Sequence, residues 1–366
     1  METGHAVKQT PFYKMHLNLG ARMLPFAGYD MPIKYKGVNE EHECVRNHAG
    51  LFDVSHMGEF ILRGPNALDL IQKTTSNDAS KLFDGKVQYS CFPNHEGGIV
   101  DDLLVYRIKE EQYMLVVNAS NIEKDWNWLK ENDEWNVDME DISDRTALLA
   151  LQGPMATLIL NPLCDFDVSE LSYYTFRKGS LCGINNVLIS ATGYTGSGGY
   201  EIYFDSGNAE KIWVELMKAG EKYGLQPAGL AARDTLRLEM GFCLYGNDID
   251  DTTSPIEAGL GWITKFTKEF NNNVSLRKQK EEGVLKKLVG FELTERGVPR
   301  KDYEIVNQDG NKIGIVTSGT MAPSLKKAIG MGYVSANYSK PDSEIFILIR
   351  DKLVPAKVVT LPFYKG

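Results

Sequence analysis

The sequence predicts an α+β fold that ends in a small all-β barrel or roll. In the first half, a hairpin-like pair of strand patterns leads into a helix, in "GGIVDDLLVYRI" and "EQYMLVVNASNIEKDWNWLK". A second stretch of strands and helices runs from about "ALLALQGP" to "LYGNDID". From "LVGFEL" onward, only short strand patterns separated by turns remain. Mixed elements followed by strands alone favour α+β layers and a separate β unit.

Length and composition limit the classes of protein to consider. At 366 residues the chain has room for about two or three domains. Its 43% hydrophobic and 24% charged residues are typical of a globular protein. The 40 basic and 49 acidic side chains leave a net charge of -9, which argues against a nucleic-acid partner, because neutralising phosphates needs a basic surface. A local basic patch is still compatible with this charge.

Cysteine usage and hydropathy indicate the compartment. The five cysteines are widely spaced and form no CxxC pair, so we expect a reducing environment with neither a disulfide framework nor a zinc site. The six histidines contain no HExxH, and no metal site is expected. The start, "METGHAVKQTPFYKM", has no apolar segment, and no run approaches the ~18 apolar residues of a membrane span. A cytoplasmic protein without a membrane partner is predicted.

The first strand pattern carries two adjacent acids, Asp101 and Asp102. Because side chains alternate along a strand, Asp102 shares a face with Tyr106, and Asp101 points the other way with Leu103. The alternation predicts that the two carboxylates do not share one site. A buried carboxylate needs a charged or hydrogen-bonding partner, or serves in catalysis. The alternative is an edge strand just after a turn, on which both acids stay solvated.

The helix after this hairpin is predicted from its apolar spacing. Ile122, Trp126 and Leu129 fall on one helical face, and either Ser120 or Asn121 is suited to be the N-cap. The hairpin and the helix together favour α+β layering.

The second stretch contains a glycine-rich turn. The sequence "GYTGSGGYE" joins the strand patterns "NVLISAT" and "YEIYF", as in a hairpin. Its glycines can let the backbone approach a ligand closely, although such turns more often serve backbone geometry alone. The turn lacks the lysine of a phosphate-binding loop, so a nucleotide site has little support.

A charged helix follows in "AGLAARDTLRLEMG", and we expect it to end at Gly241. Arg233 and Arg237 lie four residues apart and project from one side. Arginine pairs well with the carboxylates of an acidic substrate. The alternative, which is the more common case, is a structural ion pair with Asp234, with Glu239 or with an acid elsewhere in the chain.

Residues 268–287 are polar and charged, and we interpret them as a linker to the last domain. Beyond them, strand patterns such as "YEIVNQDGNKIGIVTSG", "EIFILIR" and "KVVTLPF" are separated by turns that include Asp309-Gly310. This pattern predicts the barrel or roll.

Taken together, these motifs resemble one known family. The series "FAGYDMP", "LFDVSHMGEF", "GGIVDDLLVY", "GYTGSGGYE", "AGLAARDTLRLEMGFCLYGNDID", "SPIEAGLGW" and "TSGTMAPSLKKAIGMGYV" is similar to the glycine cleavage system T-proteins, the aminomethyltransferases. The similarity runs in order from about residue 10 to the end. It implies three domains around a central cavity. Residues 1–275 would form the folate-binding region, with roughly 55–145 inserted between 1–54 and 146–275, and residues 285–366 the barrel.

The resemblance also implies a reaction and its partners. Such proteins move the methylene of an aminomethyl group, carried on the lipoyl arm of H-protein, to tetrahydrofolate with release of ammonia. Tetrahydrofolate is the co-substrate, and no metal is expected. The carrier in this family is acidic, so a basic docking patch is expected unless the side chains are ordinary solvated surface. The candidates are Lys326, Lys327, Arg296, Arg300 and Lys301.

Site residues are carried over from the same resemblance. Asp102 matches the catalytic aspartate, and Glu201 matches the glutamate that grips the pterin, whose adjacent N–H donors suit one carboxylate. Arg233 matches a folate-site arginine that either holds a pterin oxygen or fixes Glu201. Tyr364 is expected to approach the substrate. The remaining positions that would line the folate cavity are Met57, Tyr89, Tyr106, Asn118, Tyr194 and Phe242.

One difference from the family motif and two alternative protein families bear on the predicted function. The family turn usually reads Gly-Tyr-Thr-Gly-Glu-Asp-Gly, whereas Ser197 and Gly198 stand here, which puts loop-tip contacts in doubt and leaves the pterin glutamate in place.

Folate-dependent demethylating oxidases carry an added flavin domain, for which this chain has neither the length nor the Rossmann-type fingerprint. A non-catalytic folate-binding relative involved in iron–sulfur assembly would carry a KGCYxGQE-type motif, which is absent.

Overall fold

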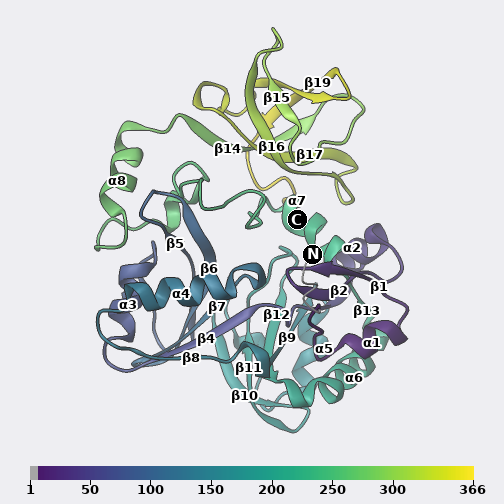
Figure 1. Ribbon diagram of the computed structural model, residues 1–366. Coiled ribbons are helices and arrows are strands. Elements are labelled where there is room, and N and C mark those ends of the chain that lie inside the picture. The colour runs from purple at the N-terminus through teal and green to yellow at the C-terminus, as the bar shows by residue number, and fades with distance from the viewer. Residues whose placement is uncertain (1–6) are drawn as a thin grey trace, which may run out of the picture.

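The computed structural model describes residues 7–366, so the first six residues of the predicted folate-binding region lie outside the described part. Two mixed α/β layers form the lower part of the molecule, and a β-barrel lies above them (Figure 1). The C-terminus returns from the barrel to α7 (Leu230–Glu239), where the Tyr364 amide donates to the Glu239 carbonyl at 2.9 Å.

The first layer is a five-stranded sheet in the order β5-β6-β7-β4-β8, with helices packed on one face. Buried side chains of the sheet, such as Phe60 and Leu103, join Leu70 of α3 and Leu129 of α4 in one apolar cluster. The elements are β4 (Gly58–Arg63), α3 (Ala67–Thr74), η1 (Ala79–Lys81), β5 (Lys86–Pro93), β6 (Ile99–Lys109), β7 (Gln112–Val117), η2 (Ala119–Asn121), α4 (Ile122–Asn132), β8 (Asp138–Asp141) and η3 (Ser143–Arg145). Asn121 occupies the N-cap position of α4 without a side-chain cap bond.

The second layer is a six-stranded sheet in the order β10-β11-β12-β9-β3-β13. The predicted hairpin around the glycine-rich turn is present, because β11 and β12 pair antiparallel. The strands are β3 (Ala49–Asp53), β9 (Thr146–Gln152), β10 (Phe176–Leu181), β11 (Ile184–Ser190), β12 (Gly199–Asp205) and β13 (Leu225–Pro227), and the preceding hairpin is β1 (Arg22–Phe26) with β2 (Tyr29–Lys34). The helical elements are α1 (Tyr13–Asn18), α2 (Val38–Asn47), α5 (Ala156–Leu160), η4 (Asn161–Leu163), η5 (Val168–Glu170), η6 (Ser206–Asn208), α6 (Ala209–Gly220) and η7 (Glu221–Tyr223).

The two sheets share one core, and this contact positions the site. Tyr106 and Val116 of the first sheet pack with Leu148 and Tyr203 of the second, and Leu236 of α7 joins them. Apolar burial of this kind stabilises by about 25 cal/mol per Å² removed from water. Polar side chains next to this shared core therefore come from both layers.

The C-terminal part is a closed barrel in the order β14-β17-β16-β15-β18-β19, which confirms the predicted barrel. Its strands are β14 (Lys286–Leu293), β15 (Glu304–Val306), β16 (Lys312–Ala322), β17 (Lys327–Ser335), β18 (Glu344–Ile349) and β19 (Lys352–Val359), with η8 (Leu260–Ile263) before it and η9 (Ala336–Tyr338) inside it. The predicted linker at 268–287 contains α8 (Asn273–Glu282), a helix that the sequence did not predict. Only Asn273 and Leu276 of α8 are buried, so its apolar spacing was too weak to signal a helix.

A buried ionic cluster joins α2, α7 and the barrel. The Glu239 carboxylate accepts from Arg46 Nη2 at 2.9 Å and from the Ser324 backbone N at 2.9 Å, and His42 Nε2 lies 3.2 Å away. Burial raises the pKa of Glu239, but these hydrogen bonds and the His42 charge outweigh it and hold the pKa at about 2. The carboxylate is thus a stabilising anion of the folded state.

We expect this anion to make stability fall in acid. Because the folded pKa of Glu239 is depressed, its stabilisation is present above the ordinary value of 4.5 and is lost as pH falls toward about 2. The difference corresponds to ~3 kcal/mol. Urea unfolding between these pH values should show that Glu239→Gln removes this part of the pH dependence, whereas Glu43→Gln, an exposed acid on α2, leaves it unchanged. Parallel losses in wild type and Glu239→Gln would contradict the assignment.

Candidate active site

Asp102 lies on β6 with its carboxylate held from two sides. Tyr89 Oη donates to Oδ2 at 2.9 Å, and Asn118 Nδ2 donates to Oδ1 at 2.8 Å. The β5–β6 register places Cys91 opposite Asp102, so Tyr89, two residues from Cys91, projects from the same face of the sheet. Asn118 follows β7 directly, on the other side of β6. Neighbouring strands therefore fix both partners of the carboxylate.

The environment of Asp102 makes it titrate near neutral pH. Burial is the largest cause, and the negative charge of Asp101 adds to it, so the pKa of Asp102 rises from 3.8 to about 7. The hydrogen bonds from Tyr89 and Asn118 act in the opposite direction. A carboxyl group with such a pKa can exist in either protonation state at physiological pH, as acid–base catalysis requires.

Asp101 is not a solvated acid on an edge strand, and that interpretation was wrong. Its side chain is fully buried, because β6 is an interior strand and α4 covers this face. Asp101 accepts from the Asn118 backbone N (2.9 Å), from Asn118 Nδ2 (2.9 Å) and from Asn121 Nδ2 (2.6 Å). Asn118 Nδ2 thus contacts both carboxylates, and the prediction that the two acids do not share one site did not include this link between them. The alternation of side chains along the strand predicted the opposite directions of Asp101 and Asp102 correctly, but it could not predict that an amide lies between them.

Glu201 lies on β12 within a second set of polar side chains. Thr192 Oγ1 donates to Glu201 Oε2 at 2.5 Å, and the same hydroxyl lies 3.4 Å from Tyr106 Oη. Tyr106 is fully buried and hydrogen-bonded to Tyr203 Oη at 2.9 Å. Burial raises the pKa of Glu201, although the Thr192 hydrogen bond and the Arg233 charge oppose the rise. Glu201 is half-buried and keeps acceptor capacity for a donor pair.

Arg233 and two aromatic rings form the third group. The Arg233 guanidinium lies 4.5 Å from the centre of the Tyr194 ring, which stacks on Phe242 at 5.8 Å. Burial lowers the pKa of Arg233, while the charge of Glu201 raises it. The charges of both Asp102 and Arg233 act on the pKa of Tyr194, so this group lies near the other two.

The two arginines of α7 have different environments. Arg237 is buried and pairs with Asp248 at 2.7 Å and Asp234 at 2.8 Å. Among the described residues, no carboxylate oxygen lies within 4.0 Å of a guanidinium nitrogen of Arg233, whereas Arg237 has two such partners. Of the two explanations left open by the sequence, the structural ion pair holds for Arg237, whereas the ligand role of Arg233 stays a prediction.

The other expected ligand contacts are less direct. Met57 packs against the apolar cluster that contains Tyr106. Tyr364 lies against α2, with the Arg46 guanidinium 4.3 Å from its ring centre. The same guanidinium donates to Ser197 Oγ at 2.7 Å, so Ser197 in the glycine-rich turn contacts α2. The ligand contacts of Met57, Tyr106 and Tyr364 stay predictions.

Three residues of this site escaped the sequence-based prediction. Thr192, which binds Glu201, stands two residues before Tyr194 in "SATGYTG". Asn121 was considered only as a helix cap. Trp262 is 61% exposed, and its ring lies 6.0 Å from that of Tyr89. Trp262 is the last residue of the motif "SPIEAGLGW", and its place in that motif was the signal that could have identified it as a site residue.

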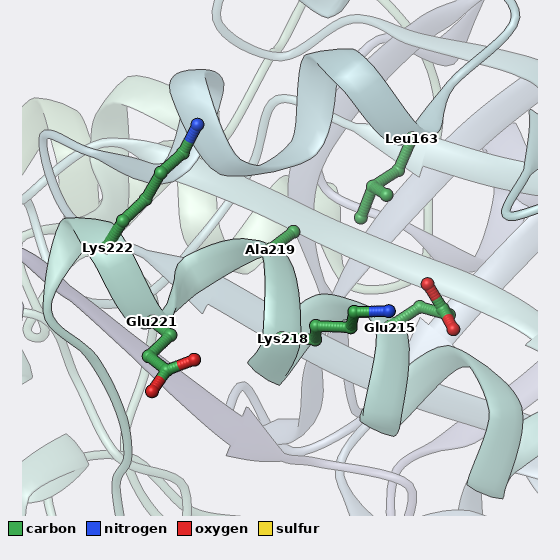
Figure 2. A pocket seen from close by; sticks show the side chains of 6 residues that line it. All are labelled: Leu163, Glu215, Lys218, Ala219, Glu221 and Lys222. Carbon is green, nitrogen blue, oxygen red and sulfur yellow. The ribbon is translucent and has the colours of Figure 1, made fainter.

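Other features of the described chain do not suggest a second site of this kind. Between residues 7 and 366, no cluster of three His, Cys, Asp or Glu side chains could hold a metal, and the five cysteines are free. No helix in that range is long and apolar enough to cross a membrane. A surface pocket lies along α6 and η7 (Figure 2), and its charged side chains do not converge on one point. It is lined by Leu163, Glu215, Lys218, Ala219, Glu221 and Lys222.

Comparisons with known proteins identify the family. A family profile described as "GCVT N-terminal domain" matches residues 12–268, and one described as "Glycine cleavage T-protein C-terminal barrel domain" matches residues 286–365. The chain belongs to the glycine cleavage T-protein family. The sequence is 63% identical to an aminomethyltransferase of Flavobacterium psychrophilum over 359 residues, and 58% identical to one of Bacteroides thetaiotaomicron over 361 residues. Each alignment covers 98% of this chain and 100% of the relative.

A solved structure agrees with this placement. The crystal structure of the glycine cleavage system aminomethyltransferase T from Bartonella henselae superposes with a TM-score of 0.92 at 34% identity, covering 98% of both chains. The predicted fold class and family are confirmed. The chain is an aminomethyltransferase of the glycine cleavage system, and the rival non-catalytic assignment is not supported.

Proposed function

We propose that the chain transfers the methylene of an aminomethyl group, presented on the lipoyl arm of H-protein, to tetrahydrofolate with release of ammonia. The observation that supports this most strongly is the Asp102 carboxyl group, which has a pKa of about 7 and is held by Tyr89 and Asn118. The decisive experiment is turnover with an aminomethylated lipoyl carrier and tetrahydrofolate. Formation of 5,10-methylenetetrahydrofolate supports the proposal. Folate binding without turnover would favour the non-catalytic alternative.

The proposed chemistry needs an anion near the reacting carbon. As ammonia leaves with the C–N bonding pair, positive charge develops on the methylene carbon, and folate N5 supplies the electron pair for the new C–N bond. The C–S bond to the lipoyl arm then breaks to leave an N5 iminium, and N10 adds to this carbon to close 5,10-methylenetetrahydrofolate. The two N–H protons of the folate end on ammonia and on the lipoyl thiol. An ionised carboxylate already oriented by fixed donors stabilises such charge without reorganisation. Asp102 has this orientation from Tyr89 and Asn118. It can also accept or return a proton, because its pKa lies near neutrality.

The pterin would bind next to Glu201 and Arg233 under this proposal. A carboxylate accepts two adjacent N–H groups of a pterin edge, and the rings of Tyr194 and Phe242 offer apolar faces to a flat ligand. Arg233 is near enough for its charge to affect the pKa of Glu201. The position of Arg233 supports both roles that the resemblance left open, which are to hold a pterin oxygen and to fix Glu201. No metal takes part in the proposed reaction.

Glu201→Gln should weaken tetrahydrofolate binding. The amide presents N–H donors to the pterin donors and carries no charge, so the Kd should rise by about 10–100-fold, as expected for hydrogen bonds to a charged group. Isothermal titration measures this directly, with Glu210→Gln on the exposed side of α6 as the matched control. An unchanged Kd in Glu201→Gln would remove this residue from the binding site.

The carrier docking patch is part of the same proposal. Lys326 and Arg296 are exposed, and no ion pair engages them among the described residues. Lys327 pairs with Glu292 at 2.8 Å, and Lys301 donates to the Gly246 carbonyl at 2.7 Å. Arg300 is also exposed and in no ion pair among the described residues, and it donates to the Gly319 carbonyl at 3.4 Å. Lys326, Arg296 and Arg300 are therefore the candidates whose charges are most available to an acidic carrier.

We further propose the domain division predicted from the sequence and a cytoplasmic location. The separate sheet formed by β4 to β8 supports the inserted segment at about 55–145, and the barrel supports the unit at 285–366. The five free cysteines support a reducing compartment.

A further inference from the structure

Asp125 is a buried acid behind the proposed catalytic residue. It lies in the first turn of α4, faces the sheet and is fully buried. Neither of its carboxyl oxygens accepts a hydrogen bond from any donor in the described part of the chain. Asp125 follows Asn121 by one helical turn, and the Asn121 side chain donates to Asp101 Oδ1 at 2.6 Å, so the Asp125 carboxyl group faces Asp101 from the same side of α4. An isolated buried carboxylate without donors is strongly unfavourable, so the form in which Asp125 exists needs an explanation.

Two carboxyl groups can hydrogen-bond only when one of them carries a proton. Ionised carboxylates are acceptors alone, so one of Asp101 and Asp125 must be the neutral acid. Asp101 already accepts three N–H donors from Asn118 and Asn121, which favour its ionised form. Asp125 accepts none. The positive end of α4 favours an anion at Asp125 by at most about 1–2 kcal/mol, which is smaller than the effect of three direct donors on Asp101.

We propose that Asp125 is a positioning residue: it carries a proton, donates it to Asp101, and thereby keeps Asp101 ionised and the Asn118 amide directed at Asp102. This inference rests on the proposed function in taking Asp102 as the reacting acid. The resulting chain of hydrogen bonds runs from Asp125 through Asp101 and Asn118 to Asp102, which also accepts from Tyr89.

The surrounding charges are consistent with a neutral Asp125. The pKa of Asp125 lies well above its ordinary value because of burial and the negative charge of Asp101. The charge of Lys124 acts to lower the pKa of Asp125, but its ammonium donates to Tyr245 Oη at 2.7 Å and to Asp251 Oδ2 at 3.2 Å. Asp102 adds a further negative charge when ionised. The groups on β6, on α4 and on the Tyr245 segment therefore leave Asp125 without a cation to hold its anion.

This arrangement has a consequence for Asp102. An ionised Asp101 next to Asp102 is one cause of the raised pKa of Asp102. If Asp101 lost the donor supplied by Asp125, Asp101 would compete for the proton that Asp102 now holds. Asp102 would then ionise at lower pH, and the two carboxyls would titrate as a coupled pair.

Two variants distinguish the effect of the hydrogen-bond donor of Asp125 from the effect of the size of its side chain. Asp125→Asn keeps a donor to Asp101, so the acid limb of kcat/KM against pH should match wild type. Asp125→Leu has similar size and no donor, and its acid limb should move down by about one pH unit. A limb that moves equally in both variants, or in neither, overturns the proposal.

Infrared spectroscopy gives a readout that does not depend on turnover. At about pH 9, where ordinary carboxyls are ionised, wild type should retain the C=O stretch of a protonated carboxylic acid, and Asp125→Asn should lose it. Glu59 is also buried with its pKa well raised, so Glu59→Gln serves as a matched control that removes a different band. An unchanged spectrum in Asp125→Asn overturns the proposal even if Asp125→Leu fails to fold. Absence of turnover in wild type would instead overturn the proposed function and leave this result standing.

Discussion

Asp102→Asn should lower kcat by about 10²–10³-fold, the loss typical of removing one preorganised electrostatic partner. The amide is nearly isosteric and can still accept from Tyr89 or Asn118, so the fold should persist. It lacks the charge that would stabilise the iminium-like methylene. In wild type, kcat/KM should fall as pH drops below about 7, because protonation of Asp102 removes the same charge. In Asp102→Asn, kcat should be low, and kcat/KM should no longer fall as pH drops below about 7.

The control for this experiment must be a carboxylate outside the network. Asp101→Asn is unsuitable as a neutral control, because Asp101 holds the Asn118 amide that binds Asp102. Asp84→Asn is suitable, since Asp84 is an exposed acid next to the same sheet, and its one ion pair within residues 7–366 is with Arg107 at 2.8 Å. Formation of methylenetetrahydrofolate from aminomethylated carrier is the assay. Near-normal turnover by Asp102→Asn would show that another residue is the catalytic acid.

Arg237→Ala should reduce the free energy of unfolding by about 3–5 kcal/mol, because breaking a buried ion pair leaves the partner uncompensated. Arg237 is 1% exposed, and its guanidinium binds Asp248 at 2.7 Å and Ser318 Oγ of the barrel at 2.8 Å. Loss of the arginine leaves Asp248 buried and charged, with only the hydrogen bonds from Thr317 and Leu244. A loss of this size is a large part of the 5–15 kcal/mol typical of folded domains.

Urea unfolding measures this difference, and two further variants test its cause. Lys312→Ala breaks an exposed barrel pair with Glu304 and should change stability by less than about 1 kcal/mol. The double change Arg237→Met with Asp248→Leu removes both charges and should recover much of the loss. If Arg237→Ala unfolds with nearly the wild-type free energy, the link between α7 and the barrel is not the stabilising contact described above.

Several elements were predictable because their causes are local. The strand carrying Asp101 and Asp102, the hairpin around the glycine-rich turn and the helix ending before Gly241 all follow from side-chain periodicity and turn residues. The barrel strands show short apolar runs between turn residues for the same reason. Helix α8 was missed because only two of its side chains are buried, so little apolar periodicity marks it.

The sequence by itself determined the order of elements, the opposite directions of Asp101 and Asp102, and, through its motifs, the family. Only the tertiary structure decided that both faces of β6 are covered and that Asn118 contacts both acids. It also decided that, among the described residues, Arg237 is in ion pairs and Arg233 is not. It also placed Asp125 on the side of α4 that faces Asp101, one turn after Asn121, whose side chain binds Asp101. The physical reason is that periodicity reports which way a side chain points, whereas its partners and its pKa depend on segments distant in sequence that meet only after packing.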